Sequence, residues 1–182
     1  MTAKSICYLI FALLIISSCS KKDDPEAPII DVSKQWSIDP LGNVISSTGD
    51  RQWQATTFTE AELNLFSSLD TADLSGTNAP AFVLETPPTY SSIYPNPFIT
   101  VHSLSLRFDN GYFGRIVFKC VIVDSTMTPH FKLATRLFIP NASINLSFNP
   151  TLPVGRFRFF YTLSSQTKPH FYKNWGNIQK TQ

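Results

Sequence analysis

Cysteine is scarce in this chain, with three residues among 182, at positions 7, 19 and 120. Cys7 lies within an apolar N-terminal run and Cys19 follows it, so Cys120 is alone in the rest of the sequence. A single cysteine cannot form a disulfide within its own domain, and the hydrophobic core must stabilise the fold instead. Cys120 lies in the apolar run IVFKCVIV, which predicts a small buried side chain rather than a nucleophile.

An excess of charge of one sign is also lacking. Fifteen Lys and Arg residues against 13 Asp and Glu residues give a net charge of +2, and the basic residues form no clustered patch. This balance argues against nucleic acid as a partner, because nucleic-acid-binding domains present strongly positive surfaces. The chain beyond its first 18 residues is long enough for one domain with a core of its own.

Signals for catalysis and for metal binding are few. The three histidines, His102, His130 and His170, are scattered, and no serine or cysteine has a recognisable nucleophile context. Asp70-Thr71 occurs once, whereas an aspartic-protease site needs two carboxylates that share a proton. Asp109-Asn110-Gly111 is too short for a calcium loop and predicts a tight hairpin turn. We therefore predict no catalytic residue, no metal site and no cofactor; a hydrolase with an unrecognised site is the enzymatic alternative.

The amino end has the layout of a secretory signal. Lys4 precedes an apolar run from Ile6 to Ile16, which as a helix reaches only about 16 Å. That length is too short for a bilayer core of about 30 Å, and the small residues Ser17 and Ser18 follow the run. The sequence therefore predicts a signal peptide over residues 1–18.

Ile16-Ser17-Ser18-Cys19 resembles the lipobox of bacterial lipoproteins. The resemblance implies cleavage before Cys19 and acyl chains on that residue, and two or more chains anchor a protein stably without spanning the membrane. An ordinary secretory signal or an uncleaved anchor is the alternative. Residues 19–32 are charged and contain proline, which predicts a disordered tether.

Within the tether, Lys21, Lys22, Asp23 and Asp24 resemble the export signal of surface lipoproteins in the Bacteroidetes group. The resemblance implies a location on the outer membrane, facing the cell exterior, and as partners the membrane and the machinery that processes and exports lipoproteins. The periplasmic face of that membrane and a plain solvated spacer are the alternatives.

The second half of the chain has the period-two pattern of half-buried antiparallel strands. Apolar residues alternate with polar ones in three runs: Leu104, Leu106 and Phe108; Ile144, Leu146 and Phe148; and Phe157, Phe159, Tyr161 and Leu163. Phe160 breaks the last run on its outer face. The run Arg115 to Val123 is apolar on both faces except at Lys119, which predicts a central strand.

The first half is less regular. Lys34 to Ile38 and Gln52 to Phe58 predict short strands that each add a tryptophan to the core, and Ala81 to Glu85 predicts another. Thr59 to Leu69 predicts one short helix, because Thr59 and Glu62 form a capping box. Together these elements predict an all-β fold over residues 33–182: a single antiparallel immunoglobulin-like β-sandwich of seven to nine strands with at most one short helix.

Two motifs lie nearly sixty residues apart in the second half of the sequence. Tyr94-Pro95-Asn96-Pro97-Phe98 predicts an extended chain that enters a strand from Ile99 to Phe108. Leu152-Pro153-Val154-Gly155-Arg156-Phe157 leads from a turn into an aromatic strand. The pair resembles the C-terminal sorting domain of type IX secretion cargo over residues 93–163. The resemblance implies a small immunoglobulin-like sandwich that directs export and is removed at the surface.

Three hypotheses about function follow. The first is a lipid-anchored, surface-exposed lipoprotein with a non-catalytic sandwich for binding or assembly of a protein or glycan ligand that the sequence does not identify. Phe160, Tyr172 and Trp175 are its candidate contact surface, because aromatic side chains serve interfaces well, although such residues more commonly belong to the core. The second is a sorting and export module, and the third is the hydrolase.

Overall fold

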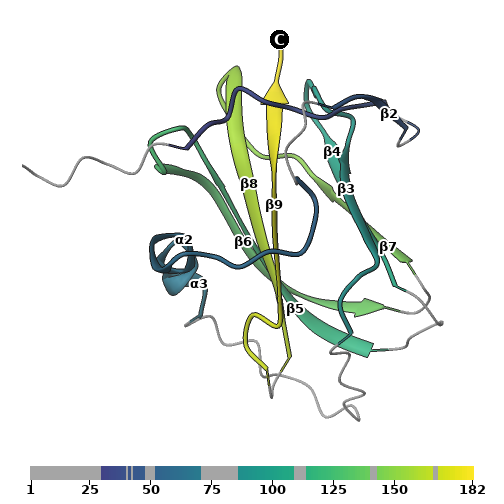
Figure 1. Ribbon diagram of the computed structural model, residues 1–182, viewed down its shortest axis with the longest axis vertical. Coiled ribbons are helices and arrows are strands. Elements are labelled where there is room, and N and C mark those ends of the chain that lie inside the picture. The colour runs from purple at the N-terminus through teal and green to yellow at the C-terminus, as the bar shows by residue number, and fades with distance from the viewer. Residues whose placement is uncertain are drawn as a thin grey trace, which may run out of the picture.

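The computed structural model describes residues 30–39, 41, 43–47, 52–70, 86–108, 114–139, 143–165 and 168–182, and this part of the chain is mostly β-structure (Figure 1). Its strands are β1 (Ser37–Ile38), β2 (Val44–Ser46), β3 (Tyr90–Tyr94), β4 (His102–Arg107), β5 (Gly114–Val123), β6 (Pro129–Ile139), β7 (Ser143–Phe148), β8 (Gly155–Ser164) and β9 (Tyr172–Lys180). Two short helices, α2 (Glu60–Asn64) and α3 (Ser67–Asp70), precede β3. The predicted all-β class is confirmed.

The strands form two packed antiparallel sheets and a small hairpin. The three-stranded sheet has the order β3-β4-β7, the four-stranded sheet has the order β6-β5-β8-β9, and β1 pairs with β2. If β3 to β9 are labelled A to G, the sheets read ABE and DCFG. This is the immunoglobulin-like sandwich with its fourth strand moved to the CFG sheet. The tight hairpin predicted at 109–111 lies outside the described residues, but β4 and β5 on either side of it belong to different sheets and do not pair with each other.

The core lies between the two sheets. On β8 the odd-numbered side chains Phe157, Phe159, Tyr161 and Leu163 point into it, as the alternation predicts. Leu104 and Leu106 of β4 pack against them from the three-stranded sheet, and Cys120 lies among them on β5. Cys120 is fully buried, and burial raises the pKa of its thiol, which matches the prediction of a structural rather than a reactive cysteine.

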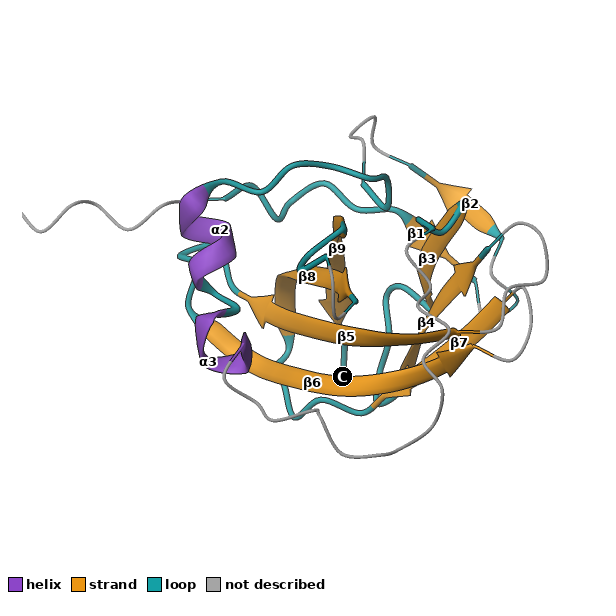
Figure 2. Cartoon of the chain, turned by 90° about the horizontal axis from the view of Figure 1, so that it is seen from below, coloured by secondary structure: helices purple, strands orange, loops and turns teal. Residues whose placement is uncertain are grey.

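The four-stranded sheet is buried on its other face as well. Phe160 and Val121 project from that face and pack against Phe66, which lies between α2 and α3. The Thr59 side chain accepts a hydrogen bond from the Glu62 N–H, as the predicted capping box requires. The predicted helix is divided into two, and both pieces cover the sheet on the side away from β3 and β4 (Figure 2).

Residues 52–58 form no strand, which corrects the prediction for Gln52 to Phe58. They follow the free edge of β9 instead: the Trp53 N–H donates to the Trp175 carbonyl at 2.8 Å and the Thr56 N–H donates to the Lys173 carbonyl at 3.0 Å. Trp53 adopts a positive φ of 61°, which turns its indole into the core. The segment thereby shields a sheet edge that would otherwise expose unpaired backbone groups.

Two strand boundaries differ from those predicted. The strand expected over Lys34 to Ile38 is reduced to β1, and the strand expected from Ile99 begins at His102. The strand expected over Ala81 to Glu85 lies outside the described residues. Ile30, the first described residue, contacts the sandwich, because its N–H donates to the Ser125 carbonyl at 2.9 Å.

Candidate functional site

The two halves of the sorting-like motif lie at the same end of the sandwich, beside the end of β9. The Phe98 N–H donates to the Gln179 carbonyl at 2.9 Å, and Gly155 pairs with Lys180. Phe98, Leu152 and Phe157 are all buried. The two motif segments are nearly sixty residues apart in the sequence, and their shared contacts with the end of β9 bring them together in space.

The YPNPF segment connects the antiparallel strands β3 and β4. Its Tyr94–Pro95 and Asn96–Pro97 peptide bonds are both cis. Because β3 and β4 are antiparallel neighbours, the segment reverses the direction of the chain and is not the extended lead into a strand that the two prolines predicted. Gly155 opens β8 with an ordinary φ, and a Cβ added there would lie 3.5 Å from the Phe157 ring, a normal contact.

Asn96 joins three segments of the chain from a site that is 1% exposed. Its side-chain amide donates to the Trp36 carbonyl at 2.8 Å and to the Asn177 carbonyl at 2.9 Å. Its side-chain carbonyl accepts from the Gln179 N–H at 3.0 Å. Its backbone also forms both hydrogen bonds of a bridge to Ile38, at 2.9 and 3.0 Å. Asn96 therefore fixes the N-terminal segment and β9 to the motif.

His102 lies directly under this segment and was not singled out as a site residue from the sequence. Its ring is edge-on to Phe98 at 4.2 Å between centroids and also contacts Phe148 and Phe159. Neither ring nitrogen has a hydrogen-bond partner, and the side chain is fully buried. Burial, together with the positive charge of Lys180, lowers the pKa of His102 to about 4. The period-two alternation could have indicated that His102 is buried, because residues 102, 104 and 106 share one face of β4.

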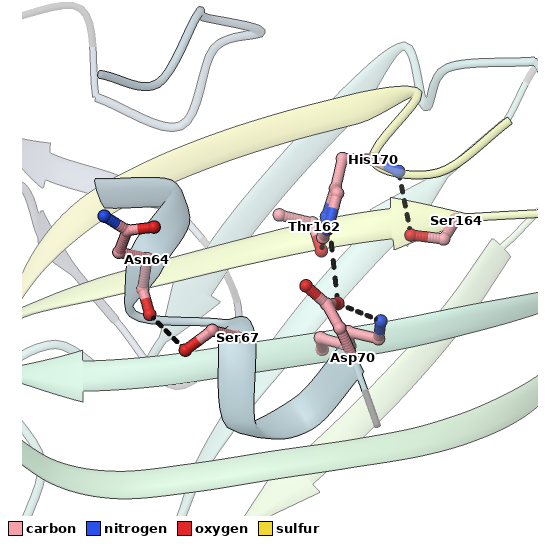
Figure 3. A network of polar contacts seen from close by, with 7 residues as sticks. Asn64, Ser67, Asp70, Thr162, Ser164 and His170 are labelled. Atoms are coloured by element: carbon pink, nitrogen blue, oxygen red, sulfur yellow. Dashed lines mark hydrogen bonds and ion pairs between the residues drawn. The ribbon is translucent and has the colours of Figure 1, made fainter. Parts of the chain in front are cut away.

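A second polar cluster joins α3 to the outer face of the four-stranded sheet (Figure 3). Asp70 at the end of α3 forms an ion pair with Lys119 of β5 and lies 3.5 Å from Nε2 of His170. The other ring nitrogen of His170, Nδ1, lies 3.1 Å from the Thr162 hydroxyl of β8. The His170 N–H donates to the Ser164 hydroxyl at 2.9 Å, and His170 has a positive φ of 49°.

The order of hydroxyl, imidazole and carboxylate in this cluster is that of a nucleophile with its base. Thr162, however, is fully buried under α3, so its hydroxyl cannot reach a substrate. Burial lowers the pKa of His170, the charges of Lys119 and Lys173 lower it further, and the Asp70 carboxylate opposes them. The cluster therefore holds α3 on the sheet, and Asp70 pairs with a lysine rather than with a second carboxylate.

His130 and Asp124 also come together, at 2.9 Å between Nε2 and Oδ2. Asp124 lies in the β5–β6 turn, where its other carboxylate oxygen accepts from the backbone N–H groups of Thr126 and Thr128. Burial raises the pKa of Asp124, but the hydrogen bonds from His130, Thr126 and Thr128 outweigh it and hold the pKa at about 2. The Thr126 hydroxyl contacts Asp124 and Thr128, so the group stabilises a turn.

The candidate contact surface is corrected by burial. Phe160 is fully buried and Tyr172 is 5% exposed, so both belong to the core. Trp175 is partly buried beneath the guanidinium of Arg158, which lies 4.0 Å from the centroid of its ring. The sequence pattern placed Phe160 correctly on the outer face of β8. Phe160 is buried rather than exposed because the two helices cover this face.

The described residues contain neither a metal-binding group nor a membrane-spanning helix. Within the described ranges, no group of three His, Cys, Asp or Glu side chains is placed to hold a metal ion. No helix in the same ranges is long and apolar enough to cross a bilayer. Residues 1–29 lie outside the described part, so Cys19, Lys21, Lys22, Asp23 and Asp24 remain predictions from sequence.

Comparison with known protein families and with curated proteins gives no match to this chain.

Proposed function

We propose that the protein is a lipid-anchored lipoprotein of the bacterial outer membrane, exposed at the cell surface, whose β-sandwich is a non-catalytic module for binding or assembly. The observation that carries the proposal is the place where the chain joins the sandwich. Ile30 is hydrogen-bonded to the β5–β6 turn only eleven residues after Cys19. A lipid on Cys19 would thus keep the folded domain close to the membrane through a short charged linker.

The side-chain clusters support a non-catalytic domain. The hydroxyl that would serve as a nucleophile, on Thr162, is fully buried. His102 is enclosed by aromatic rings, and His130 closes a turn with Asp124. A reactive group needs access to substrate as well as a base, and these groups are committed to holding elements together.

A sorting and export module is the second candidate, favoured by the meeting of the YPNPF and LPVGRF segments beside β9. The resemblance covers residues 93–163. The long strand β9 that follows departs from it, because the sorting family usually closes with a short strand soon after the glycine-aromatic motif.

The intact mass of the mature protein from its native membrane tests both candidates. The mass of acylated Cys19 through Gln182 is the result expected from the first proposal. A chain that ends near Thr89 to Tyr94 would mean that the second half is removed, as in sorting domains. An unmodified Cys19 or a retained signal peptide would contradict the lipid anchor.

A further inference from the structure

Exposed apolar side chains gather at one end of the sandwich. Eight large hydrophobic residues in the described part of the chain are exposed, and six of them lie on loops or on the β1–β2 hairpin at this end. These six, which we name the apolar rim, are Leu41, Val44, Ile45, Ile99, Val101 and Val154. The other two, Tyr90 and Phe138, belong to the opposite end, where β3 and β5 begin.

The strand registers place the rim at a single end. Ile38 pairs with Asn96, which brings the β1–β2 hairpin to the β3–β4 connection that carries Ile99 and Val101. Phe98 pairs with Lys180, and Lys180 pairs with Gly155, the neighbour of Val154. Figure 1 shows β2, the start of β8 and the C-terminus at this end.

The rim residues are strongly exposed. Leu41 is 86% exposed, Ile45 70%, Ile99 60% and Val154 58%. Single exposed hydrophobic residues are ordinary on protein surfaces, whereas their concentration on one face marks an interaction surface.

The segment that follows the predicted tether reaches the sandwich at the same end. Ile30 is bonded to Ser125 in the β5–β6 turn, and Val123 just before this turn pairs with Arg158, three residues from Gly155. Ile30 lies eleven positions after Cys19, a reach of at most about 40 Å and about 18 Å on average for a flexible chain. A lipid on Cys19 would therefore keep this end, rather than the opposite one, near the bilayer.

We propose that the apolar rim inserts into the interface of the membrane that holds Cys19, as a second contact that orients the sandwich with this end down. The inference rests on the proposed lipid anchor. The contact is apolar rather than electrostatic, because the described charges at this end nearly cancel: Lys34, Arg156, Arg158 and Lys180 against Asp31, Asp39 and Asp124. Branched aliphatic side chains on loop tips suit the boundary between headgroups and acyl chains.

The test uses the mature lipidated protein in vesicles of phosphatidylethanolamine and phosphatidylglycerol, with an environment-sensitive NBD probe on an introduced cysteine. Ile45→Cys places the probe on the rim, and Phe138→Cys places it at the opposite end as the matched control. Cys120 is fully buried and an acylated Cys19 has no free thiol, so unsubstituted protein reports the background. Flotation with the vesicles confirms anchoring in each sample.

The expected result is a blue-shifted emission at position 45 that nitroxide-labelled lipids quench, with a water-like, unquenched emission at position 138. Floating protein with a water-like probe at position 45 would overturn rim insertion and leave the lipid anchor standing. A blue shift without lipid quenching that grows with protein concentration would show that a second copy covers the rim, which also overturns the inference. Protein with unmodified Cys19 that does not float would instead contradict the proposed function.

Discussion

His102 carries a titratable ring into an aromatic cage formed by Phe98, Phe148 and Phe159. Its pKa falls from an ordinary value of 6.5 to about 4 on folding, because burial penalises the charged ring. The unfolded chain therefore binds this proton more readily than the folded chain does. The contribution of His102 to stability is complete above pH 6.5 and is lost as the pH falls toward 4, a loss of about 3 kcal/mol.

We expect the free energy of unfolding, measured by urea denaturation at several pH values, to fall between pH 6.5 and pH 4. The variant His102→Leu, which removes the two unpartnered ring nitrogens, should flatten most of this slope. It should also be at least as stable as the wild type at pH 7, since an apolar side chain suits the cage. Equal slopes for the variant and the wild type would show that other groups control the acid sensitivity.

The loop 52–58 covers the free edge of β9. The lack of a side chain at Gly176 allows this loop to pack closely against the strand. Trp53 is 5% exposed, and its indole packs against Gly176 so closely that an added Cβ would overlap the ring. The indole cannot withdraw easily, because the Trp53 backbone is bonded to Trp175 and its ring contacts Phe159.

Gly176→Ala should lower the free energy of unfolding by about 1–3 kcal/mol or more, because overpacking displaces Trp53 from the core. Gly155→Ala is the matched control: its Cβ would meet the Phe157 ring at an ordinary 3.5 Å. Thermal unfolding monitored by tryptophan fluorescence would compare the two. If both substitutions had the same effect, the close approach of Trp53 to β9 would be contradicted.

At the scale of the whole molecule, the first third of the chain supplies core side chains and hydrogen bonds to the sandwich that the later strands form. Residues from Ile30 onward contribute Trp53 to the inner core and Phe66 to the outer face, and they bond to Asn96 and Asn177. Removal of these residues would expose the outer face of β8, leave a cavity at the place of Trp53 in the inner core and leave the edge of β9 unpaired.

We therefore expect a chain that carries residues 89–182 directly after the lipidated cysteine to lack a cooperative thermal transition and to bind a hydrophobic dye. Shortening the charged segment 20–28 is the control and should leave the transition temperature of the domain unchanged. A truncated chain that melts cooperatively would show that the second half is self-contained, which would favour a sorting domain over a single sandwich.

The amino-acid sequence by itself determined the all-β class, the inner face of the strands, the helix start at Thr59 and the burial of Cys120. These features depend on local spacing: period-two alternation fixes which side chains share a face, and a capping box needs only neighbouring residues. The predicted outward position of Phe160 followed from the same spacing and was correct for the sheet.

Only the tertiary structure decided what covers each face and which distant groups meet. Phe160 is buried because α2 and α3 pack over it, and the YPNPF and LPVGRF segments meet because β9 lies between them. Thr162, His170 and Asp70 come together from three elements. Such contacts depend on sheet order and on the path of irregular segments, which no periodicity within one strand encodes.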